Sequence, residues 1–258
     1  MPYAPEHRRY YDADSHIMEL PDFLKAYADP GIRDQIPEVN YSASLVTDEE
    51  VAVIVGQGSR HSREHVQAQI ELGDNLIRTS KEIQALGAFN SSDRSTALDM
   101  LGFEKQLVFA THSVVLPFHP SSKTSPELRY GAARAHNRHM ADFCQSDDRL
   151  MGVAVVPLDD PQAAILEVDS ILESGLEAVW VPHRAPIGMS PGHTDLEGSG
   201  PVLPRRVFPS FYMWAGPRFN RSRLGATMAA LQSRIGWVVV RTCAQRMLRS
   251  YTNHPRRS

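Results

Sequence analysis

The stretch YDADSHIMEL (11–20) places two carboxylates and one imidazole at alternate positions: Asp12, Asp14 and His16. If the stretch is a β-strand, alternate side chains share a face, so all three should point the same way. Two carboxylates placed together away from water are unfavourable unless a positive group lies between them. A divalent cation, a nearby arginine or open water would each meet that need.

Asp14 and His16 form an Asp-x-His pair at the end of this predicted strand. The carboxylate and imidazole of such a pair can reach one ion, at roughly 2.0–2.2 Å each for zinc. His183 ends a later apolar stretch, VWVPHRAP, and is the candidate third ligand. Such a set suits zinc first, with manganese or iron(II) as alternatives. Without a metal, the pair would be a solvated loop and His183 a structural histidine; Asp12 is interpreted as structural.

The other histidines give weaker signals. His61 and His65 lie four apart on a predicted helix and are expected on its solvated surface. His136 and His139 are expected to face solvent or the exterior of the fold. His112 follows a predicted strand, where it could contact substrate.

Cysteine and serine chemistry is not supported. Cys144 and Cys243 are too few and too isolated for a disulfide framework or a thiolate zinc site. Neither Ser15 nor Cys144 has an evident base partner, so no nucleophile or other catalytic residue is assigned.

Apolar strands alternate with amphipathic helices from about residue 91. Helices are predicted at 91–104, capped by Ser91 or Ser92, and at 125–146 and 160–175; strands are predicted at 105–111, 150–158 and 177–183. A short helix is also expected at 21–28, and the segment 59–89 is expected to be largely helical. This alternation predicts an α/β fold with a parallel sheet, whose carboxyl edge carries the chemistry. No glycine-rich loop follows the first strand, which argues against a nucleotide-binding open sheet.

Composition is ordinary for a globular enzyme, with 42% hydrophobic and 22% charged residues over 258 positions. The net charge of -3 argues against a nucleic-acid partner. No segment approaches the ~18 apolar residues of a membrane span, and the N-terminus lacks a signal sequence. We therefore expect a cytoplasmic protein with a small-molecule substrate and no membrane partner.

Two blocks resemble the amidohydrolase-related (amidohydrolase 2) family, whose members include aminocarboxymuconate-semialdehyde decarboxylase. The first is DADSHIMELPDFL; the second runs from ARAHNRHMADFCQSDDRLMG through VAVVPLDDPQAAILEVDSILESG to LEAVWVPHRAP. The resemblance covers residues 9–196. It implies a metal-dependent (β/α)8 barrel that hydrolyses or decarboxylates, and it matches Asp14, His16 and His183 to metal ligands. Relatives often form homo-oligomers.

The family's next strand, of the type FLLHVGG, and the aspartate ligand of its last strand are not identified here. After about Leu196 the alternation stops, and only the stretch 236–240 is predicted as a strand. Yet Phe208 to Gly216, read with codons displaced by one nucleotide, permits PFLLHVGG. This suggests that the chain after roughly 196–207 is translated out of frame; a truly divergent C-terminus is the alternative.

Two parts are therefore predicted: a barrel portion at 1–196 and a divergent segment at 197–258. The fold class is α/β, a partial TIM-type barrel that is incomplete after about residue 200. The expected function is a metal-dependent hydrolase or non-oxidative decarboxylase of a small carboxylated or cyclic substrate. Loss of the second barrel half is expected to weaken metal affinity, solubility and turnover. The alternative is a non-catalytic barrel fragment without a specific ligand.

Overall fold

Five parallel strands form one sheet in the computed structural model, which describes residues 3–4, 7, 9–42, 44–79, 82–118, 124–180 and 210–212. The strands are β1 (Tyr11–His16), β2 (Lys105–Phe109), β3 (Leu150–Val155), β4 (Ala178–Trp180) and β5 (Ser210–Tyr212). Their spatial order is β1-β2-β3-β4-β5, and every neighbouring pair is parallel. The predicted α/β class with a parallel sheet is confirmed.

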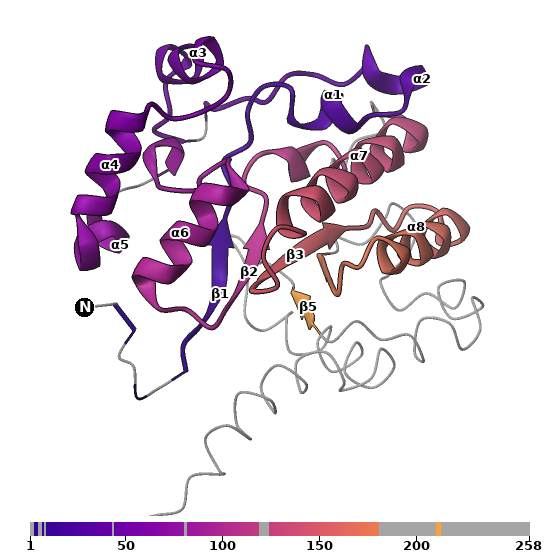
Figure 1. Ribbon diagram of the computed structural model, residues 1–258. Coiled ribbons are helices and arrows are strands. Elements are labelled where there is room, and N and C mark those ends of the chain that lie inside the picture. Colours follow the sequence, from indigo (N-terminus) through magenta and orange to yellow (C-terminus); the bar gives the residue numbers. More distant parts are fainter. Residues whose placement is uncertain are drawn as a thin grey trace, which may run out of the picture.

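Helices connect the strands and flank the sheet (Figure 1). The α-helices are α1 (Phe23–Tyr27), α2 (Pro30–Arg33), α3 (Asp48–Gly56), α4 (Arg63–Glu71), α5 (Leu76–Thr79), α6 (Ser91–Leu101), α7 (Pro126–Cys144) and α8 (Pro161–Glu173). Short 3-10 helices are η1 (Gly73–Asn75), η2 (Glu82–Gln84) and η3 (Ser113–Val115). No helix in the described part of the chain is long and apolar enough to cross a bilayer.

The regular βα units begin where the sequence predicts them, because side-chain caps define the helix starts. Ser125 accepts a hydrogen bond from the backbone N–H of Leu128, and Asp160 caps α8 in the same way. The cap of α6 was predicted one or two residues too late. Asn90 accepts from the backbone N–H groups of Ser92 and Asp93 instead.

The prediction of a largely helical segment at 59–89 is wrong in its continuity. The segment is divided among α4, η1, α5 and η2, and α4 buries none of its residues. Gly73, with φ of 53°, follows α4 in the left-handed region that glycine adopts at little cost. The apolar spacing of this segment therefore serves short surface elements rather than one core helix.

A β-bulge interrupts β1 between its acidic residues. Asp12 pairs with Gln106, whereas Ser15 and His16 pair with Val108 and Phe109, so one extra residue lies in β1. The extra residue places Asp12 on the face of Gln106 and Val108, and His16 on the opposite face with Phe109. The prediction that Asp12, Asp14 and His16 point the same way is therefore wrong for Asp12.

The two faces of the sheet carry different apolar clusters. The larger cluster lies between the sheet and the helices and includes Val108, Ala154 and Val179. A smaller cluster on the other face joins Phe109, Val153 and Ala178, with Trp180 packed against it. His16 thus belongs to the face opposite the helices.

His136 is fully buried between α7 and β3, and its expected exposure to solvent is wrong. Its Nε2–H donates to the carbonyl oxygen of Val153, so Nδ1 accepts the hydroxyl proton of Ser113. Burial lowers the pKa of His136 to about 4, with Glu19 opposing the shift and His139 adding to it. His139 is also largely enclosed, because its ring stacks on Phe23 at 3.8 Å and binds the carbonyl oxygen of the same residue.

We predict that acid destabilises the fold through His136. Because its pKa is lower in the folded chain than in the unfolded chain, the unfolded chain binds more protons as pH falls below 6.5. The free energy of unfolding should drop by about 2 kcal/mol between pH 7 and pH 5 from this group. Urea unfolding across this range should show the loss, and His136→Gln should remove most of it. An unchanged pH slope in the variant would contradict the assignment.

Candidate metal centre

The His16 ring is oriented by the loop that follows β2. Nδ1 lies 3.2 Å from the carbonyl oxygen of Ala110 and 3.3 Å from Oγ1 of Thr111. The Thr111 hydroxyl donates its own proton to the carbonyl oxygen of Ile17, at 2.7 Å. Both neighbours of Nδ1 are therefore acceptors, which places the ring proton on Nδ1.

Nε2 of His16 consequently faces Oδ1 of Asp14 with a lone pair when the ring is neutral. The two atoms are 3.3 Å apart. Ligands about 2.0–2.1 Å from one tetrahedral ion would lie roughly 3.3–3.4 Å apart. A second proton on the ring would also satisfy the pair, but only as a weak ion pair, because the Asp14 and His16 side chains are 73% and 41% exposed.

The chemistry of this donor pair fits a divalent cation. A histidine that ligates a metal usually donates its other N–H to a carbonyl oxygen or carboxylate, which fixes the ring and its tautomer. Ala110 provides that acceptor for His16. Among the residues described here, however, no group of three histidine, cysteine, aspartate or glutamate side chains could hold a metal. His183, the predicted third ligand, lies outside the described residues.

Asp12 has a structural role beside the bulge. Its Oδ1 accepts the backbone N–H of Asp14 at 3.0 Å, and its Oδ2 accepts the side-chain amide of Gln106 at 2.9 Å. These bonds stabilise the extra residue of β1 and leave Asp14 free to turn toward His16. The interpretation of Asp12 as structural agrees with this geometry.

The ring of His16 continues into an aromatic row on the same face of the sheet. It stacks on Phe109, with ring centroids 5.6 Å apart, and Phe109 meets the edge of Trp180 at 5.8 Å. Apolar rings beside a charged site exclude water on one side and strengthen electrostatic interactions there.

Glu19 anchors the loop that carries Thr111. Its buried carboxylate accepts three successive backbone N–H groups, from Thr111, His112 and Ser113, at 2.7–3.1 Å. Ser113 in turn bonds to His136, so the anchor continues into the core. The sequence contains Glu19 directly after the predicted strand, but nothing in its spacing marks it as a buried ligand of backbone amides.

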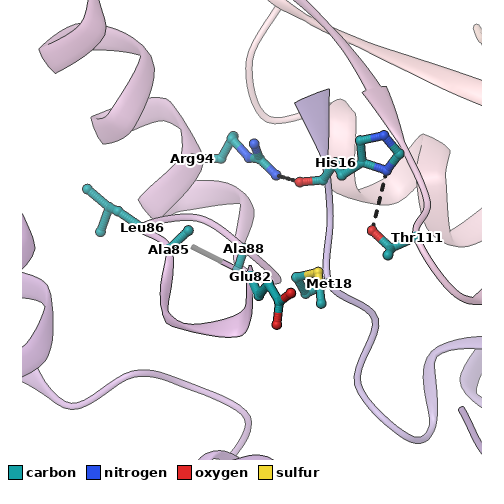
Figure 2. A pocket seen from close by; sticks show the side chains of 8 residues that line it. All are labelled: His16, Met18, Glu82, Ala85, Leu86, Ala88, Arg94 and Thr111. Atoms are coloured by element: carbon teal, nitrogen blue, oxygen red, sulfur yellow. Dashed lines mark hydrogen bonds between the residues drawn. The ribbon is translucent and has the colours of Figure 1, made fainter. Parts of the chain in front are cut away.

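A pocket of about 370 Å³ lies beside the carboxyl end of β1 (Figure 2). It is lined by His16, Met18, Glu82, Ala85, Leu86, Ala88, Arg94 and Thr111. Arg94 extends from α6 toward the strand end, where it donates to the hydroxyl of Ser15 at 2.8 Å and to the carbonyl oxygen of His16 at 2.5 Å. Burial lowers the pKa of Arg94 to about 10.

The wall formed by residues 82–88 packs directly on α6. A Cβ at Gly87 would lie 2.3 Å from the Cα of Arg94, so only glycine permits this contact. Two histidines hold the same wall: Nε2 of His61 binds the carbonyl oxygen of Ile83, and Nε2 of His65 binds that of Gln84, both at 2.9 Å. The prediction that His61 and His65 lie on a solvated helix surface is therefore wrong. His61 precedes α4, and burial lowers its pKa.

The remaining candidates lie away from the pocket. His112 packs its ring against Tyr41, with centroids 5.2 Å apart, and does not line the pocket. Ser15 bonds to Arg94, and burial raises the pKa of the Cys144 thiol to about 12, so neither is an activated nucleophile.

Comparison with known proteins shows the fold. A crystal structure of an amidohydrolase from Mycobacterium avium subsp. paratuberculosis K-10 is similar, with a TM-score of 0.57 and 15% identity over 92% of this chain and 69% of that chain. The predicted α/β fold of partial barrel type is confirmed by this likeness. The chain matches no protein-family model and no curated protein. At this identity the likeness concerns the fold and leaves the activity to be argued from the site.

We predict that Glu19→Gln destabilises the chain by on the order of 3 kcal/mol. The amide loses the negative charge and turns an N–H₂ group toward backbone N–H groups that have no other acceptor among the described residues. Urea unfolding measures the change. Glu173→Gln, an equal change of charge at an exposed position, is the control and should alter stability little. Equal effects of the two substitutions would refute the anchoring role of Glu19.

Proposed function

We propose that this chain is built as a metal-dependent hydrolase or non-oxidative decarboxylase of a small carboxylated or cyclic substrate. The observation that carries the proposal is the pair of Asp14 Oδ1 and His16 Nε2, 3.3 Å apart, with the ring proton committed to Nδ1. The likeness in fold to an amidohydrolase supports it. The third ligand proposed is His183.

A bound divalent ion would supply a Lewis acid that activates water or polarises a substrate carbonyl. Zinc is proposed first, with manganese or iron(II) as alternatives, because imidazole and carboxylate suit all three. The chain's own residues do the rest. Ala110 and Thr111 orient His16, Glu19 holds their loop, and Phe109 shields one side of the ring from water.

A second candidate is a non-catalytic barrel fragment. The observation that favours it is that the described residues offer two neighbouring metal donors, on an exposed strand end, and no group of three. Two donors hold zinc weakly, and a barrel with five described strands leaves the site open on one side. The substrate is proposed to be a small molecule, with no nucleic-acid or membrane partner, in a cytoplasmic protein that forms a homo-oligomer as its relatives do.

Metal binding by the full chain separates these candidates. We expect the metal-depleted protein to bind one zinc ion by titration calorimetry, and Asp14→Asn or His16→Asn to weaken binding roughly tenfold or more. Asp12→Asn is the matched control, because it removes an equal charge two residues away on the other face. Identical affinities of the Asp14→Asn and Asp12→Asn variants would exclude the proposed site.

We also propose that residues 197–258 form a separate segment translated out of frame. The displaced reading of 208–216 restores the motif of the family's next strand, and residues 210–212 within it pair in parallel with β4. Sequencing the gene around codons 190–210 should reveal an insertion or deletion that restores further barrel strands. A displaced frame without recoverable strands would show true divergence instead.

A further inference from the structure

The pocket beside β1 contains a buried positive charge that the described residues do not neutralise. The Arg94 side chain donates to two neutral acceptors, the Ser15 hydroxyl and the His16 carbonyl oxygen. Its Nε–H has no hydrogen-bond partner within the described part of the chain, and the residue is 8% exposed. A buried guanidinium without a bound anion is unfavourable, because the lost hydration is not replaced.

We propose that this pocket binds a small monocarboxylate, with Arg94 as the residue that selects the negative charge. A guanidinium has five donors in a planar fork that matches a carboxylate, and two of them have partners here. The inference rests on the proposed function, because it names the substrate class of the same site. The shared wall at His16 would bring the bound molecule next to the Asp14–His16 pair.

The walls define the rest of the ligand. Met18, Ala85, Leu86 and Ala88 provide an apolar lining that suits a short hydrocarbon body. The volume of about 370 Å³ lies at the small end of the range for ligand pockets. Glu82 also lines the pocket, and its carboxylate repels a second negative charge. A monocarboxylate therefore fits better than a dicarboxylate or a phosphate ester.

Butyrate and butyramide test the charge selection, because they have similar shapes and differ in charge. We expect titration calorimetry with the full, metal-free chain to show butyrate binding at least tenfold more tightly than butyramide. Glu82→Gln should tighten butyrate binding by two- to fivefold, whereas Glu49→Gln, an exposed change of equal charge on α3, should not. Equal binding of the two ligands, or no effect of Glu82→Gln, overturns the proposal.

Two further variants separate this inference from protein folding and from the metal site. Arg94→Gln should abolish the preference for butyrate. If that variant fails to fold, Ala85→Leu decides, because it fills the pocket from a half-buried position and should remove butyrate binding. Asp14→Asn should lose metal while retaining butyrate, because Asp14 does not line the pocket. Butyrate binding that requires Asp14 and added zinc would assign the anion to the ion and refute the role of Arg94.

Discussion

The bulge in β1 is the constraint on which the candidate site depends. Without the extra residue, Asp12, Asp14 and His16 would lie on one face, and two carboxylates would compete for one imidazole. The bulge turns Asp12 toward Gln106 on the helix side and leaves a single carboxylate beside His16. A bulge of this kind re-aims side chains at the cost of one unpaired residue, and Asp12 offsets that cost by accepting the backbone N–H of Asp14.

Buried polar groups fix the carboxyl edge of the sheet in a continuous series. Glu19 binds the backbone amides after β2, Ser113 links that loop to His136, and His136 binds β3. Asn137, the next residue of α7, pairs with both the N–H and the carbonyl oxygen of Val155. Each member is satisfied, and such a network rigidifies the loops from which the site residues project.

The sequence predicted the features that local chemistry determines. The strands and helices after residue 91 follow from apolar periodicity and from caps such as Ser125 and Asp160, and their parallel order follows from the alternation. The bulge was not predictable, because it arises from pairing with β2. The same reason explains His61 and His136: their spacing resembles that of exposed histidines, but each binds a carbonyl oxygen from a distant segment. Arg94 was missed because a lone arginine on a helix gives no sign of burial.

The balance of exposed and buried groups argues that the strand end is organised for a ligand. A contact between Asp14 and His16 at this exposure adds at most about 1 kcal/mol to stability. The groups that hold it, Glu19 and Arg94, are buried charges, which are costly to desolvate. A fold selected for stability alone would be served as well by apolar residues at those two positions. Burying a carboxylate and a guanidinium to orient an exposed imidazole and line a pocket is the arrangement expected where bound ions complete the electrostatics.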